Sequence, residues 1–161
     1  MGARRCTQVY FAETVTDEPE GAAPCPEGGD RDLSELSRHE LGELGEDIAA
    51  AHLADTGLVV IERNYRCSEG EADIVAVDED EGSIVLVEVK TRRADAGGGF
   101  FAEEAVDAAK RRRYRRIAAA YLMEHFPVPA IRFDVIAVTV PKGGPIEVHH
   151  VPGAFDWDAQ R

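Results

Sequence analysis

Two short apolar segments that carry charged residues constrain this chain more than any other feature. The segment GEADIVAV contains Asp73, and the segment IVLVEVKTRR contains Glu88 and Lys90. Both segments are rich in β-branched residues, which is typical of buried strands. Charged side chains inside such strands cost free energy unless they are paired with opposite charges or bind a metal ion. The two segments therefore predict a sheet that holds a polar site.

The spacing of the two strands predicts which of these side chains face one another. The acidic segment DEDEG between them is typical of a hairpin turn, and we place the turn at residues 79–82. Because side chains alternate along a strand, Glu88 and Lys90 share a face, and Asp73 lies opposite Glu88 with the Cβ atoms about 5 Å apart. At an effective dielectric constant of about 20, two carboxylates that close repel by roughly 3 kcal/mol, and Lys90 offsets only part of this.

A third acid extends the predicted site toward a helix. Glu46 lies among small residues on a predicted helix that precedes the strands. Three acids and one lysine leave two negative charges, which a divalent cation would neutralise, and oxygen ligands favour Mg²⁺ or Mn²⁺. Each residue alone is also compatible with a salt bridge or an exposed strand position. The combination of Asp73, Glu88 and Lys90 on adjacent strands with Glu46 favours a site.

The order of predicted elements indicates the fold class. Ser37 and Glu40 have the spacing of a capping box, which places a helix start at Ser37. The predicted elements are a helix from Ser37 to about Gly57, strands at 58–64, 71–77 and 83–91, a helix at about 103–125, a strand at 131–140 and a short edge strand at 145–151. This order predicts an α/β domain with a central mixed β-sheet flanked by helices.

Composition sets the domain organisation and the compartment. Residues 1–33 are rich in Pro, Gly, Glu and Asp, which predicts a disordered acidic tail before one domain at 34–161. The chain has no apolar run long enough to cross a membrane and no apolar signal-peptide region, so we expect no membrane partner. Its three cysteines form no CxxC pair and no even set, which favours a reducing compartment and a cytoplasmic protein.

The charge distribution favours a local contact with phosphate groups. A net charge of −13 argues against a surface that coats nucleic acid generally, because such a surface would be basic. The segment KRRRYRR at 110–116 nevertheless packs six positive charges into seven positions. The alternative is a solvated helix face that balances the chain's own acids. The candidate nucleic-acid-binding residues are Arg63, Arg66, Lys110, Arg111, Arg112, Arg113, Arg115 and Arg116.

Several of these motifs together resemble a known family. Gly45-Glu46, the stretch Arg63-Asn64-Tyr65-Arg66, Gly70-Glu71-x-Asp73, Glu88-Val89-Lys90 and RFDVIAV are similar to the YraN family of small bacterial endonuclease-like proteins. The likeness runs from about Leu41 to Val138. The family in turn resembles PD-(D/E)xK nucleases, in particular archaeal Holliday-junction resolvases. One departure is Ala72, which stands where those nucleases often have proline before the aspartate.

The resemblance implies a restriction-endonuclease-like fold and a role for each site residue. Glu46, Asp73 and Glu88 would hold Mg²⁺ or Mn²⁺, and Lys90 would act on the attacking water or the transition state. The implied function is a metal-dependent nuclease acting on DNA, with branched DNA as one expected substrate. The alternatives are an inactive nucleic-acid-binding module on the same fold and an acidic protein-interaction domain. The sequence leaves the oligomeric state open, with a homodimer as one possibility.

Overall fold

A computed structural model of the chain describes residues 6–10, 33, 35–94, 108–128, 130–142 and 144–155. The elements are β1 (Cys6–Tyr10), α1 (Arg38–Asp55), β2 (Val59–Cys67), β3 (Gly70–Asp78), β4 (Ser83–Ala94), α2 (Ala108–His125), β5 (Ile131–Pro141) and β6 (Ile146–Val151).

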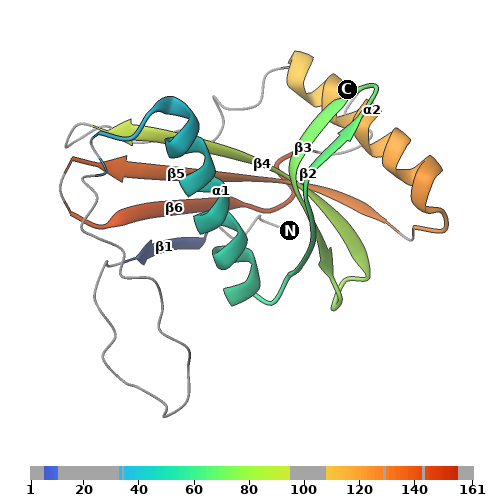
Figure 1. Cartoon of the computed structure of the whole chain (residues 1–161). Helices are drawn as coiled ribbons and strands as arrows, with labels where there is room; N and C mark the ends of the chain where they lie inside the picture. The colour runs from blue at the N-terminus through green and yellow to red at the C-terminus, as the bar shows by residue number, and fades with distance from the viewer. Residues whose placement is uncertain are drawn as a thin grey trace, which may run out of the picture.

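The predicted α/β architecture with a mixed sheet is confirmed (Figure 1). Six strands form one sheet in the order β1-β6-β5-β4-β3-β2; β4 and β5 pair in parallel, and the other neighbours are antiparallel. Alternate residues of β4 pack into two hydrophobic cores, one on each face of the sheet. Val85 and Val87 face the core under α1, and Leu86 faces the core under α2. Among the described helices, neither is long and apolar enough to cross a membrane.

Helix α1 begins where the sequence predicts, and Leu41, Leu44 and Ile48 of this helix belong to or pack against one hydrophobic core. The Ser37 hydroxyl accepts the Glu40 N–H at 3.2 Å, and the Glu40 carboxylate accepts the Ser37 N–H at 2.8 Å, which completes the capping box. In its last turns Ala51 is exposed, whereas His52 and Leu53 are fully buried. The His52 ring packs edge-on against His150 of β6, with 5.3 Å between ring centroids.

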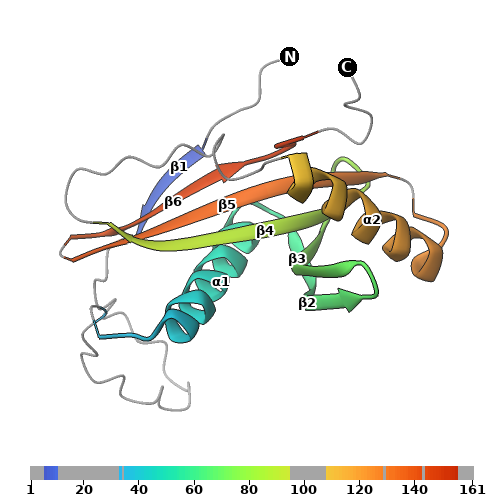
Figure 2. The same ribbon diagram turned by 90° about the horizontal axis from the view of Figure 1, so that it is seen from above.

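The β3–β4 hairpin opens where its charged residues begin. Regular pairing runs from Asp78 and Ser83, which close the turn at 79–82 as predicted, to Ile74 and Val87. Beyond that point the Val89 N–H donates to the Asp73 side chain at 2.7 Å. Strand β4 continues beside β5, while the β2–β3 hairpin leans away from it (Figure 2). The separation of β3 from β4 creates a cleft.

The N-terminal segment and the last strand differ from their predictions. Residues 6–10, which lie within the predicted disordered tail, form β1 and pair with Ile146 to His150 of β6. β6 is therefore an inner strand, because β1 satisfies the backbone groups that an edge strand would leave unpaired. The rest of the predicted tail, apart from Leu33, lies outside the described residues, as do positions 103–107 of the predicted second helix.

The docking of α1 on β4 is testable with a matched pair of glycines. A methyl group at Gly45 would overlap the Thr91 side chain, whereas one at Gly42 would meet nothing within 4 Å. Alanine is favoured over glycine in a helix interior by about 1 kcal/mol. We therefore expect Gly42→Ala to stabilise the fold by up to about that amount, and Gly45→Ala to destabilise it by about 1–3 kcal/mol in urea unfolding. Equal effects of the two substitutions would contradict this packing.

Candidate functional site

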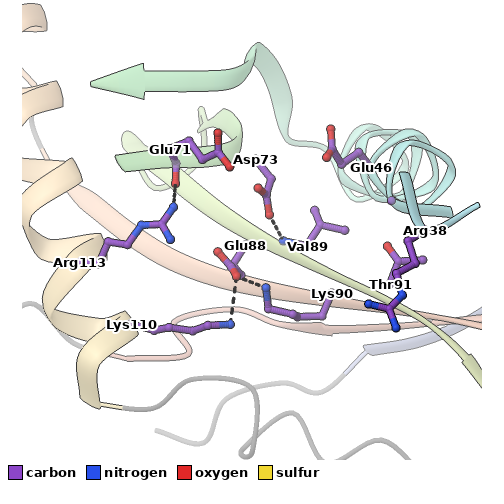
Figure 3. Close-up of a pocket in the computed structure, with 11 residues that line it drawn as sticks. Arg38, Glu46, Glu71, Asp73, Glu88, Val89, Lys90, Thr91, Lys110 and Arg113 are labelled. Atoms are coloured by element: carbon purple, nitrogen blue, oxygen red, sulfur yellow. Dashed lines mark hydrogen bonds and ion pairs between the residues drawn. The ribbon is translucent and has the colours of Figure 1, made fainter. Parts of the chain in front are cut away.

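The cleft at the β3–β4 opening gathers charged side chains from four elements. It encloses about 370 Å³, with α2 on one side and α1 on the other (Figure 3). Its lining residues are Arg38, Gly42, Glu46, Glu71, Asp73, Glu88, Val89, Lys90, Thr91, Lys110 and Arg113. The four predicted catalytic residues, Glu46, Asp73, Glu88 and Lys90, all belong to this set.

The Asp73 side chain accepts a backbone hydrogen bond at the point where β3 and β4 separate. Its Oδ2 accepts the Val89 N–H, so the carboxylate is held between the two strands. Burial, aided by the nearby negative charges of Glu88 and Glu46, raises the pKa of Asp73 from its ordinary 3.8 to about 6, and the Val89 N–H and Lys90 oppose that rise.

Glu88 is the most heavily bonded acid in the cleft, and its side chain is 14% exposed. Its Oε1 accepts hydrogen bonds from Lys90 and, at 3.4 Å, from Lys110, while its Oε2 accepts the Tyr114 hydroxyl. Burial alone would raise the pKa of Glu88, but the Lys90 and Tyr114 hydrogen bonds outweigh it and lower the pKa. Glu88 is therefore an anion whose two oxygens are both engaged.

Glu46 lies across the cleft and is held by strand β2. Its Oε2 is 3.3 Å from the Asn64 amide nitrogen and 3.6 Å from the Arg63 guanidinium. Asn64 supports this contact from a left-handed backbone conformation, with φ of 55°. The three predicted ligands thus line one cleft without forming a cluster. Within the described part of the chain, no three His, Cys, Asp or Glu side chains are arranged to hold a metal ion.

The charge balance of the cleft differs from the balance predicted from sequence. Four acids line it, Glu46, Glu71, Asp73 and Glu88, and so do four bases, Arg38, Lys90, Lys110 and Arg113. The predicted excess of two negative charges is therefore absent when Asp73 is ionised. Carboxylate oxygens are suitable ligands for Mg²⁺ or Mn²⁺. Their arrangement does not fit a bound cation while basic side chains contact the carboxylates of Glu46 and Glu88.

The basic run of α2 divides between the cleft and the outer surface. Lys110 and Arg113 line the cleft, and Arg113 donates to the Glu71 carbonyl at 3.4 Å. The other four basic residues do not line it: Arg115 is half-buried, and the exposed ones are Arg111, Arg112 and Arg116. Arg116 pairs with Glu69 at 3.3 Å, so this helix also fixes the β2–β3 turn.

The two candidate arginines of β2 both contact acids of the protein itself. Arg63 binds Asp47 of α1 at 2.7 Å, and Arg66 binds Glu71 at 3.3 Å. A second hollow, bordered in part by Arg66 and Cys67, shares Glu71 and Arg113 with the cleft. Arg66 is thus placed beside an extension of the site, whereas Arg63 holds α1 to β2.

Two residues of the site were not predicted from the sequence. Tyr114 is buried, and its hydroxyl donates a hydrogen bond to Glu88. Its position one helical turn after Lys110 is the signal that could have revealed it, because residues four apart share a helix face. Arg38, at the start of α1, reaches the cleft without any local sequence signal.

The raised pKa of Asp73 predicts a measurable pH dependence in metal-free buffer. Between about pH 4 and 6 the folded protein binds a proton that the unfolded chain has lost, so its stability falls as the pH rises. Asp73→Asn keeps an acceptor for Val89 and removes this penalty. It should raise the free energy of unfolding at pH 7 by up to about 3 kcal/mol and flatten the pH profile.

Urea unfolding at several pH values, with a chelator present, measures this effect. The exposed turn variant Asp80→Asn controls for the general loss of one negative charge. A lower stability of Asp73→Asn than of the parent at pH 7 would contradict the assignment.

Comparison with known proteins assigns this chain to a family. The model described as "Uncharacterised protein family UPF0102" matches residues 45–138, which is more than half of the chain. The chain belongs to the UPF0102 family. This confirms the predicted resemblance, since UPF0102 is the YraN family. The matched UPF0102 region contains Glu46, Asp73, Glu88, Lys90 and the whole basic run 110–116.

Bacterial UPF0102 proteins resemble the chain over most of its length. A UPF0102 protein of Frankia casuarinae is 46% identical over 120 residues, which cover 74% of this chain and 98% of that protein. One of Mycolicibacterium smegmatis is 47% identical and covers 75% of this chain and 97% of its own. One of Mycobacterium ulcerans is 39% identical, with 75% and 98% covered.

Proposed function

We propose that this UPF0102 protein binds nucleic acid, DNA in the first place, and hydrolyses its phosphodiester bonds in the cleft with Mg²⁺ or Mn²⁺ as cofactor. The scaffold would be restriction-endonuclease-like. One observation carries the proposal: Asp73, Glu88 and Lys90 meet where β3 and β4 separate, beside basic side chains of α2. Apolar strands that open onto paired acids and a lysine suit a reaction at an anionic phosphorus centre.

The position of each basic residue in the cleft indicates its proposed role. Lys110 and Arg113 stand at the α2 side of the cleft and Arg38 at the α1 side, where they can contact phosphates on both sides of the scissile bond. Lys90 shares a strand face with Glu88 and would stabilise the negative charge that develops on the phosphoryl oxygens. Once an ammonium group has left Glu88, Asp73 and Glu88 would be the residues to hold a divalent cation, which would add positive charge at the same phosphate.

The exposed arginines of α2 predict sequence-independent binding. Arg112→Ala combined with Arg116→Ala should weaken binding to every DNA sequence alike and lower the slope of log affinity against log salt by about 2. Fluorescence anisotropy of labelled duplexes at several salt concentrations measures both quantities. Lys142→Ala, which removes a cation from the β5–β6 turn, is the control. If the double variant binds as the parent does, the run is only a solvated helix face.

A cleavage screen tests the proposed activity. Branched, flapped, single-stranded and duplex DNA, with matched RNA, are incubated with Mg²⁺ or Mn²⁺ and either the parent or Glu88→Ala. The proposal predicts cleavage of at least one substrate by the parent alone. If no substrate is cut under conditions in which it is bound, the activity is refuted.

The engagement of Glu88 favours a second candidate function. Because both of its oxygens accept hydrogen bonds from the protein, the cleft also suits a module that binds nucleic acid without cleaving it. Salt-dependent binding without cleavage by the parent would select this alternative. Absence of any salt-dependent binding would favour an acidic protein-interaction domain.

A further inference from the structure

We propose that Lys110 is a displaceable cation that keeps divalent metal out of the cleft until a phosphate group draws it away. The inference rests on the proposed function and concerns how the same site is regulated. It would make metal loading depend on bound nucleic acid.

The contacts of Glu88 show what a metal ion would have to displace. Lys90 and Lys110 share Oε1, and the Tyr114 hydroxyl takes Oε2. A cation binds a carboxylate through those same oxygens, and two ammonium groups nearby would repel it. Glu88 can therefore serve as a ligand only after at least one ammonium group has moved.

Lys110 is the group that can move with the least disturbance. Lys90 lies two residues from Glu88 on the same face of β4, and its contact with Oε1 is the closer of the two. Lys110 reaches across from the first turn of α2, its contact is 3.4 Å long, and its side chain is 37% exposed. Its four-carbon stem can swing outward without a change in the helix.

A phosphate group bound by Lys110 and its neighbour Arg113 would draw the Lys110 ammonium group away from Glu88. Arg113, three residues later on α2, lines the same cleft, so the two cations could hold one phosphate together at the mouth. With Lys110 turned outward, the charges left in the cleft sum to −1 because the eight lining charges otherwise balance. Phosphate binding outside and metal binding inside would then favour one another, as linkage requires.

Metal affinity tests this inference without any reading of activity. Titration calorimetry with MnCl₂ compares the parent with Lys110→Met, which keeps a flexible unbranched side chain, one atom shorter, and removes its charge. We expect Mn²⁺ to bind Lys110→Met about tenfold more tightly. Arg112→Met removes one cation from the same turn without touching Glu88 and should change the affinity far less. Lys110→Gln is a second variant, and circular dichroism verifies that each variant is folded.

A second measurement tests the release by phosphate. Binding of a short labelled DNA duplex to the parent should tighten when Ca²⁺ is added, and this coupling should be smaller in Lys110→Met because its cleft is already open. Unchanged Mn²⁺ affinity in both Lys110 variants, including no binding at all, overturns the inference. Equal coupling in parent and variant overturns the role of phosphate. The cleavage screen can fail or succeed independently of both results.

Discussion

Lys90→Met is expected to lower the rate of DNA cleavage about 10²- to 10³-fold while weakening DNA binding only slightly. Lys90 is half-buried beside Glu88, and burial would lower its pKa, but its hydrogen bond to Glu88 outweighs this and raises the pKa. The side chain is therefore a fixed positive charge in a sheltered cleft. Removal of one group that stabilises a developing negative charge typically lowers the reaction rate by about 10²- to 10³-fold.

The comparison with metal affinity makes this prediction specific to the chemical step. Loss of Lys90 removes a competitor for Glu88, so Mn²⁺ should bind the variant at least as tightly as the parent. A lower rate at saturating Mn²⁺ and saturating protein would then report the reaction itself. Cleavage by Lys90→Met at the parent's rate would refute the role of Lys90 even in an active nuclease.

Asp134→Ala is expected to destabilise the protein by about 3–5 kcal/mol, which is a fall of about 10 °C in Tm. The Asp134 side chain is fully buried on β5 and accepts from Arg132 at 3.0 and 3.2 Å. It also accepts the Gly153 N–H at 2.9 Å and contacts His150 Nε2 at 3.0 Å. Truncation leaves buried donors without this acceptor, and each such loss is costly.

The same network provides the control. Glu81 also binds Arg132, at 2.9 Å, but its side chain is 67% exposed, so Glu81→Ala should cost less than about 1 kcal/mol. Thermal unfolding of both variants measures the difference. Equal stabilities would show that the buried carboxylate contributes nothing beyond a surface ion pair. Arg132 and Asp134 thus form a structural ion pair, and neither residue lines the cleft.

The features that could be predicted from sequence are those fixed by short segments. The length of the 79–82 turn sets the register of β3 and β4 as far as Ile74 and Val87, and Asp73 and Glu88 are the next residues, where the strands separate. Strand alternation then places Lys90 on the face of Glu88. The Ser37 capping box is equally local, which explains why the start of α1 is correct.

The features that were missed depend on how distant segments pack. The contact of Lys110 with Glu88 requires the position of α2 over the sheet, which no local pattern specifies. The contact of the Glu46 side chain with Asn64 depends on the left-handed backbone conformation of Asn64 in β2. The pairing of β1 with β6 joins opposite ends of the chain. A count of charges along the sequence could therefore not reveal that the cleft is neutral.

The most direct test of the central claim is a single-turnover cleavage assay. Protein in excess over a labelled DNA substrate chosen by the screen, with Mn²⁺ at saturation, is compared for the parent and Glu88→Ala, purified in the same way. We predict that the parent converts the bound substrate to product and that Glu88→Ala binds it equally well and leaves it intact. Intact substrate in the parent reaction, or equal rates from both proteins, would contradict a catalytic role for the cleft.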